Sequence, residues 1–247
     1  MNDMKLMKRQ FKNAATTKNN LLSNTARNQE QLNNLLNDID KGIFDKETAP
    51  IFELANKYKL AIEVHPYDGE KIVQLENKAW RFHLVWMIAQ CADAYHFYTL
   101  EGLYEKYPDI RVCFAHGGQL NHLNIGRRTQ GFDGRPDLFE GMERPRKAVG
   151  HPNIFFDTLV HDTGSLGLLV KNQGVKQVLM GLDDPYPLGE MESEIQSSYP
   201  GKILDLAKEQ KILTEQDCDA IWEDNVIQWL CGDDELAKQK LIKRILS

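Results

Sequence analysis

The stretch EKYPDIRVCFAHGG, residues 105–118, indicates how this chain folds. It continues a helical pattern, passes into the apolar run IRVCFA (110–115) and then changes to a histidine and two glycines. A short apolar run that follows a helix and is bounded by turn residues is typical of a buried strand in a parallel sheet. We therefore predict a strand over 110–115 whose carboxyl end presents His116.

Three other short apolar runs occur, and the first and the last of them follow a helical pattern. They are LAIEV (60–64), NIFFDTLV (153–160) and KQVLMG (176–181), and a long helical pattern from about Leu84 to Lys106 separates the first two strands. Strands that alternate with helices of this length predict βα units on a parallel sheet, so the predicted fold class is α/β. Further helical patterns follow around 190–209, 214–230 and 234–246.

Composition excludes several classes of protein. The 247 residues carry a net charge of −6, which argues against a dedicated nucleic-acid surface because phosphate binding needs clustered Lys and Arg. No apolar run approaches the ~18 residues of a membrane span, and there is no secretory signal pattern. The four cysteines include no Cys-x-x-Cys pair, so a reducing compartment is the default. We expect a cytoplasmic protein that binds neither nucleic acids nor membranes.

The chain is predicted to have three parts. Residues 1–45 form a polar, Asn-rich segment that is helical or disordered, residues 46–232 form the α/β domain, and residues 233–247 form a C-terminal helix. The first 29 residues are basic and poor in acids, as in a transit peptide. They show no clear amphipathic stripe, so a solvated arm is the favoured interpretation.

Histidine or aspartate follows each of the four apolar runs. The residues are, in order, His65, His116, His161 and the pair Asp183 and Asp184. Ligands bind at the carboxyl ends of the strands in parallel α/β folds, and the chain has only seven histidines, so we predict a shared site. Imidazole and carboxylate are ligands of zinc and similar ions, and a bound metal makes water a better nucleophile.

Five longer motifs resemble one known family. They are VHPYD (64–68), EKYPDIRVCFAHGG (105–118), GRRTQGFDGRPDL (126–138), DTLVHD (157–162) and GLDDPYPLGE (181–190). In this order and spacing they are similar to the 2-amino-3-carboxymuconate-6-semialdehyde decarboxylases, which are metal-dependent enzymes of the amidohydrolase superfamily. The resemblance covers about residues 50–232.

This resemblance implies a metal-dependent hydrolase-like TIM (β/α)8 barrel, of which the chain carries strands five to eight after a helical N-terminal extension. It also implies zinc or another divalent metal. His65 and Asp183 would bind the metal, Asp183 would also orient the bound water, and His116 would be the acid/base residue. Arg127 would bind a substrate carboxylate across a dimer interface, and Trp80 would lie near the substrate.

The implied reaction is the decarboxylation of an unsaturated carboxylate in tryptophan (kynurenine) catabolism, in which metal-activated water attacks the substrate. The expected partners are a small-molecule carboxylate and either a second copy of the chain or a complementing chain. The chain departs from the family because it has no His-x-His motif, which supplies two metal ligands there, and lacks the first four βα units. The full ligand set is therefore not expected in this chain.

Two alternatives for the function stay open. The chain could be a catalytically incomplete fragment that acts as a binding partner. It could also be a related amidohydrolase that hydrolyses C–N or C–O bonds or decarboxylates an aromatic acid, because residues 83–97 carry the bulky Trp86, Tyr95 and His96 where the family has small residues.

The candidate residues also have structural alternatives. His65 could cap a strand, Arg127 could form a solvated basic pair with Arg128, and Trp80 could lie in the core. A register slip would exchange Asp183 for Asp184. Supporting or structural roles are predicted for Asp157 and His161, and no functional role is predicted for His122.

Overall fold

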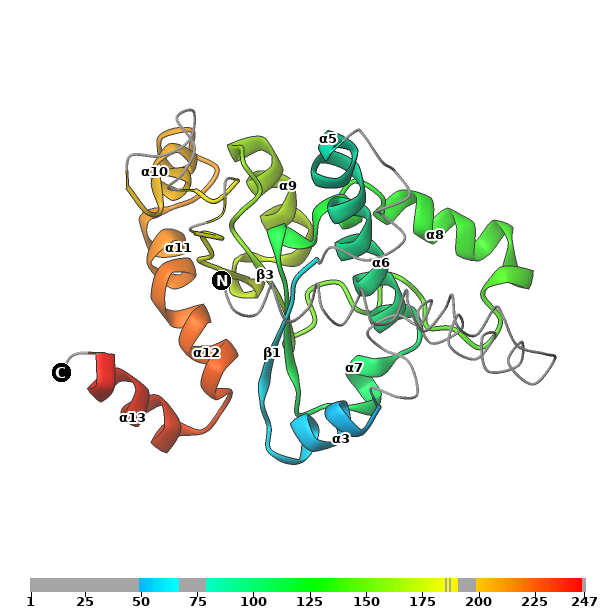
Figure 1. Ribbon diagram of the computed structural model, residues 1–247, viewed down its shortest axis with the longest axis horizontal. Helices are drawn as coiled ribbons and strands as arrows, with labels where there is room; N and C mark the ends of the chain where they lie inside the picture. The colour runs from blue at the N-terminus through cyan, green and yellow to red at the C-terminus, as the bar shows by residue number, and fades with distance from the viewer. Residues whose placement is uncertain (1–48, 67–78, 185, 187, 191–198, 246–247) are drawn as a thin grey trace, which may run out of the picture. The chain divides into compact units, whose positions relative to one another are not determined.

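The computed structural model describes residues 49–66, 79–184, 186, 188–190 and 199–245 (Figure 1). All of them belong to one compact unit, Lys46–Ser247, and the predicted segment 1–45 lies outside the described residues. No helix in these ranges is both long and apolar enough to span a bilayer.

The regular elements alternate along the chain as predicted. In order they are α3 (Ala49–Lys57), β1 (Ala61–Val64), α5 (Ala79–Arg81), a π-helical turn (Phe82–Trp86), α6 (Met87–Leu100), α7 (Leu103–Lys106), β2 (Arg111–Phe114), a 3-10 segment (His116–Asn121), α8 (Ile125–Gly134), a 3-10 turn (Pro136–Leu138), β3 (Ile154–Asp157), α9 (Thr163–Gln173), a 3-10 turn (Val175–Gln177), β4 (Val178–Leu179), α10 (Lys202–Glu209), α11 (Glu215–Asp219), a π-helical turn (Ala220–Asp224), α12 (Asn225–Cys231) and α13 (Glu235–Ile245).

The four strands form one parallel sheet in the order β1-β2-β3-β4. Val112 pairs with Ile154 and Phe156 pairs with Val178, so β2 and β3 pair over three residues and β3 and β4 over two. This confirms the α/β class and all four predicted strands. A closed barrel is not shown, because the described residues form a four-stranded sheet only. All four carboxyl ends lie at one edge of the sheet, where ligands bind in such folds.

One face of the sheet packs against α6 through aromatic side chains. Phe114 of β2 lies with its ring centroid 5.3 Å from that of Tyr95 and 5.8 Å from that of Tyr98. Phe156 of β3 also contacts Tyr95, and all four side chains are fully buried. Tyr95 is therefore part of the core, so its bulk does not indicate a remodelled substrate pocket.

The opposite face of the sheet packs against α12. Cys113, Phe155 and Leu179 alternate in the strands with the residues that face α6, and they pack against Val226 and Trp229. Helices therefore cover both faces of the sheet, with α6 and α12 on opposite sides of the strands (Figure 1). This arrangement buries both sets of apolar strand residues, which is what parallel sheets require.

A buried arginine fixes α12 to the sheet. The Arg111 guanidinium donates hydrogen bonds to the carbonyl oxygens of Trp229, of Leu230 at 3.1 Å and of Lys59 at 2.6 Å. The Trp229 indole in turn donates to the carbonyl oxygen of Arg111 at 3.2 Å. Arg111 therefore joins the start of β2 to α12 and to the chain just before β1.

Three predicted boundaries were wrong. The strand predicted over 176–181 is limited to Val178–Leu179, because Val175–Gln177 form a 3-10 turn. The strand predicted over 153–160 ends at Asp157, because the Asp157 carboxylate accepts the backbone N–H of Leu159 and turns the chain. His161 is therefore not a strand-end residue. The helix predicted from Leu84 to Lys106 is interrupted near Gly102, which has a φ of 65° that glycine adopts without strain.

Candidate metal centre

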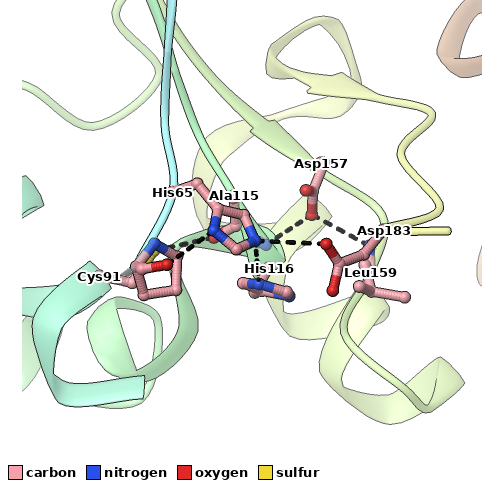
Figure 2. A network of polar contacts seen from close by, with 9 residues as sticks. His65, Cys91, Ala115, His116, Asp157, Leu159 and Asp183 are labelled. Atoms are coloured by element: carbon pink, nitrogen blue, oxygen red, sulfur yellow. Dashed lines mark hydrogen bonds and ion pairs between the residues drawn. The ribbon is translucent and has the colours of Figure 1, made fainter. Parts of the chain in front are cut away.

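Three of the predicted strand-end residues lie together at the carboxyl edge of the sheet (Figure 2). One nitrogen or oxygen atom from each of His65, His116 and Asp183 lies within 4.8 Å of the other two. The Nε2 atoms of the two histidines are 3.0 Å apart, and Asp183 Oδ1 is 3.3 Å from His65 Nε2. The cluster forms because parallel strands bring residues far apart in the sequence to the same edge.

The His65 ring is oriented by the backbone of the next residue. Its Nδ1 lies 2.7 Å from the carbonyl oxygen of Pro66, and because a carbonyl only accepts, Nδ1 carries the proton. In the neutral ring, Nε2 is then a bare lone pair that faces the other two side chains. A ring N–H donated to a backbone carbonyl is the usual arrangement of a metal-binding histidine.

The distance between His65 and Asp183 fits a shared cation. A bare imidazole nitrogen and a carboxylate oxygen 3.3 Å apart repel each other unless a proton or a metal ion lies between them. Ligand atoms bound to a tetrahedral zinc at ~2.0–2.1 Å are about 3.3 Å from one another. The two residues are therefore suited to one divalent ion, with positions left for further ligands.

His116 reaches the cluster through an unusual turn. His116, Gly117, Gly118 and Gln119 have φ values of 54°, 61°, 64° and 48°, so four consecutive residues are left-handed. A non-glycine residue in this region costs about 1–2 kcal/mol. The glycines are also required by space, since a Cβ on Gly118 would lie 2.8 Å from the Phe156 ring.

His116 is a neutral base in this environment. Burial, followed by the neighbouring His65, lowers the pKa of His116 to about 4, whereas Asp183 acts in the opposite direction. The imidazole is therefore uncharged near neutral pH and has a lone pair available. It can accept a proton from a nearby group or bind a cation.

A protein-family model for the amidohydrolases matches residues 23–228 of the chain. The chain belongs to the amidohydrolase family. The match begins at residue 23, within the Asn-rich segment that lies outside the described residues.

Two curated relatives of this amidohydrolase are named 2-amino-3-carboxymuconate-6-semialdehyde decarboxylase. The protein from Dictyostelium discoideum is 33% identical over 174 residues, which are 68% of this chain and 45% of the relative. The protein from Caenorhabditis elegans is 30% identical over 190 residues, which are 76% of this chain and 44% of the relative. These similarities confirm the resemblance seen in the motifs. The chain spans somewhat less than half the length of these relatives.

Solved structures of decarboxylases share the fold. The 5-carboxyvanillate decarboxylase of Sphingomonas paucimobilis superimposes with a TM-score of 0.62 at 17% identity, covering 77% of this chain and 55% of that protein. A dihydroxybenzoic acid decarboxylase from Polaromonas, solved with bound manganese, gives a TM-score of 0.56 at 15% identity, covering 76% and 55%. At this identity the similarity establishes the α/β fold alone.

The other predicted site residues of the amidohydrolase lie outside the three-residue cluster. Trp80 in α5 is 56% exposed, so the alternative that it lies in the core is wrong. Arg127 in α8 is exposed, whereas the adjacent Arg128 is buried and stacks 5.1 Å from the Tyr95 ring centroid, so the two are not a solvated pair. His161 is not a member of the cluster either.

Two residues beside the cluster hold the backbone of Gly117: Asp157, for which a supporting or structural role was predicted, and His122, for which none was predicted. Asp157 Oδ1 accepts the backbone N–H of Gly117 at 2.9 Å, and His122 Nε2 donates to the carbonyl oxygen of the same glycine. A sequence signal existed for Asp157, since strand alternation places it on the face of Phe155 and directs it under the site. No local signal indicated His122.

The buried histidines predict how stability depends on pH. Burial lowers the pKa of His96 and His122 to about 4, against about 6.5 in an unfolded chain. Between pH 6.5 and 4 the unfolded state therefore binds protons that the folded state does not. The free energy of unfolding should fall as the pH drops, by up to about 1.4 kcal/mol per pH unit for each histidine.

Urea unfolding between pH 4.5 and 7.5 would measure this slope. His96→Gln should show a shallower fall than the unmodified chain, because it removes one of the three histidines whose pKa is lowered to about 4, the third being His116. Asp157 has the opposite effect on the pH dependence of stability. Burial raises its pKa, so the folded state binds this proton more readily than the unfolded state. An identical slope in both proteins would contradict the assignment.

Proposed function

We propose that this amidohydrolase is a metal-dependent decarboxylase of small unsaturated carboxylates. The observation that carries the proposal is the cluster of His65, His116 and Asp183 at the carboxyl edge of the sheet. It is supported by the curated relatives, which are named for the decarboxylation of 2-amino-3-carboxymuconate-6-semialdehyde. That compound, an intermediate of tryptophan breakdown, is the first candidate substrate, and the cytoplasm is the proposed location.

In this proposal His65 and Asp183 hold a divalent ion, with zinc as the first candidate and manganese as the alternative. When bound, the ion would lower the pKa of a coordinated water and polarise the substrate. His116, uncharged near neutral pH, would act as the base that accepts a proton at its free ring nitrogen. When the carbon–carbon bond breaks and carbon dioxide leaves, the carbon retains the electron pair. The protonated His116 can then return a proton to it.

A second subunit or a complementing chain would complete the site. The cluster supplies fewer protein ligands than a closed tetrahedral site uses, so other groups must fill the remaining positions. Arg127 is exposed on α8 and carries a guanidinium suited to a substrate carboxylate, which it would bind across a dimer interface. Trp80, also exposed, would flank the substrate.

The proposal predicts a defined metal content. The chain, purified without chelator, is expected to hold about one divalent ion per protomer and to release carbon dioxide from 2-amino-3-carboxymuconate-6-semialdehyde when its partner is present. Elemental mass spectrometry, the oligomeric mass and carbon dioxide release are the measurements. His116→Ala should abolish release because it removes the proton carrier.

A control variant and two contrary outcomes test the proposed decarboxylase function. His151→Ala, in a half-buried histidine outside the cluster, should leave carbon dioxide release unchanged. Failure to bind zinc or manganese would refute the proposal. Metal binding without turnover of the semialdehyde or of aromatic acids would favour a non-catalytic binding partner.

A further inference from the structure

The left-handed turn at residues 116–119 directs the imidazole of His116. The side chain leaves the backbone from a residue with a φ of 54°, so its direction depends on the turn keeping its conformation. Two of the four residues, His116 and Gln119, are not glycine and therefore have no intrinsic preference for it. Such a turn persists only where the surrounding structure holds it in place.

Both polar groups of the Gly117 backbone are held by buried side chains. Its N–H donates to Asp157 Oδ1 at 2.9 Å, and its carbonyl oxygen accepts from His122 Nε2. Asp157 and His122 are 6% and 7% exposed, so solvent hardly competes for these hydrogen bonds. The glycine is therefore fixed from both sides.

The next residue of the turn is held in the same way. The carbonyl oxygen of Gly118 accepts from Asn121 Nδ2, and Asn121 is fully buried. The Asn121 carbonyl oxygen accepts from the buried Arg128 guanidinium at 3.1 Å, and Asn172 Nδ2 donates to the carbonyl oxygen of His122. The supports are thus themselves tied to α8 and α9.

We propose that Asp157, His122 and Asn121 are positioning residues that hold this turn and so place His116 against His65. None of the three is part of the cluster, and each bonds to the backbone of the turn that carries His116. The consequence for catalysis rests on the proposed function. The effect on the position of His116 can be tested whether or not the protein is a decarboxylase.

His122 is chemically suited to this role. Because Nε2 faces a carbonyl oxygen it must carry the proton, which leaves Nδ1 bare and without a protein partner among the described residues. The ring meets Phe156 edge-on, with the centroids 5.1 Å apart at an angle of 78°. It is therefore a neutral donor whose orientation is fixed by packing.

The test compares two variants of His122. His122→Phe keeps a ring against Phe156 and removes the donor, whereas His122→Gln keeps a donor. We expect His122→Phe to lower zinc affinity about 10–100-fold, the range found when an outer partner of a metal ligand is lost, because His116 would no longer contact the ligand His65 3.0 Å away. His122→Gln should recover most of this loss. Calorimetry measures zinc binding, and the side-chain ¹⁵N signals of His65 and His116 in the zinc-free protein report their contact.

A matched control separates positioning from general destabilisation. Ile110→Val removes one buried methylene just before β2, at the far end of the strand from the site, and should cost about 0.5–1.5 kcal/mol. It should keep normal zinc affinity and normal histidine signals. If His122→Phe does not fold, Asn121→Ala applies the same test to the Gly118 carbonyl, and a similar drop in affinity is expected.

The outcomes distinguish the two proposals. Unchanged zinc affinity and unchanged histidine signals in a folded His122→Phe or Asn121→Ala variant would overturn the positioning role. If zinc affinity and the histidine signals both change in the variant but the unmodified protein releases no carbon dioxide, the positioning role is supported and the proposed function is refuted. If the protein is a decarboxylase, His122→Phe should lower kcat with little change in KM, because the substrate contacts are intact.

Discussion

Asp183→Asn is expected to weaken zinc binding by at least about 100-fold, the upper end of what removal of an outer partner costs. The carboxylate oxygen lies 3.3 Å from His65 Nε2 and supplies the negative charge of the cluster. An amide in its place is uncharged and is a poorer ligand for a divalent ion. Titration with zinc in competition with a chromophoric chelator measures the change.

The neighbouring Asp184 provides the control for Asp183. Asp184→Asn removes the same charge one residue away, outside the cluster, and should change zinc affinity much less than Asp183→Asn. Equal losses in both variants would indicate a general electrostatic effect instead of direct binding. A larger loss in Asp184→Asn would show that the ligand is one residue further along the chain.

Gly117→Ala is expected to destabilise the fold by roughly 3 kcal/mol. The new Cβ would lie 2.3 Å from Val160 Cγ1, and the backbone φ of 61° is unfavourable for alanine. A loss of this size lowers the midpoint of thermal unfolding by roughly 6–12 °C in a domain of this length. Thermal and urea unfolding of the zinc-free protein measure it.

Gly126 in α8 is the matched control for Gly117. A Cβ there would meet nothing within 4 Å. Gly126→Ala should therefore be neutral or stabilise the protein by about 0.5–1 kcal/mol, because glycine is a poor helix former. If Gly117→Ala were as stable as Gly126→Ala, the turn would not have the conformation described.

The two glycines show which parts of the site a sequence can reveal. The His-Gly-Gly sequence after an apolar run indicated a histidine at a strand end and a nearby flexible backbone. The sequence did not indicate that the turn is left-handed over four residues. That conformation depends on Asp157 and His122, which hold Gly117 through tertiary hydrogen bonds.

Arg127 and Trp80, the two exposed candidates, show a second limit of prediction from sequence. The motifs placed Arg127 and Trp80 near a substrate, yet both lie on the surface outside the cluster. A motif gives the position of a residue along the chain but not its position in space. Whether a side chain meets the site is decided by the tertiary structure around it.

The sequence alone determined the presence of four strands in a parallel sheet and three of the side chains that follow them, because these follow from the local hydrophobic pattern. Only the tertiary structure decided which of those side chains meet. His161 lies outside the cluster because Asp157 ends β3 early. The Asp157 carboxylate accepts hydrogen bonds from Leu159 nearby and from Gly117, 40 residues earlier in the chain. Such a contact leaves no periodic signal in either segment, since it forms only when β2 and β3 pair side by side.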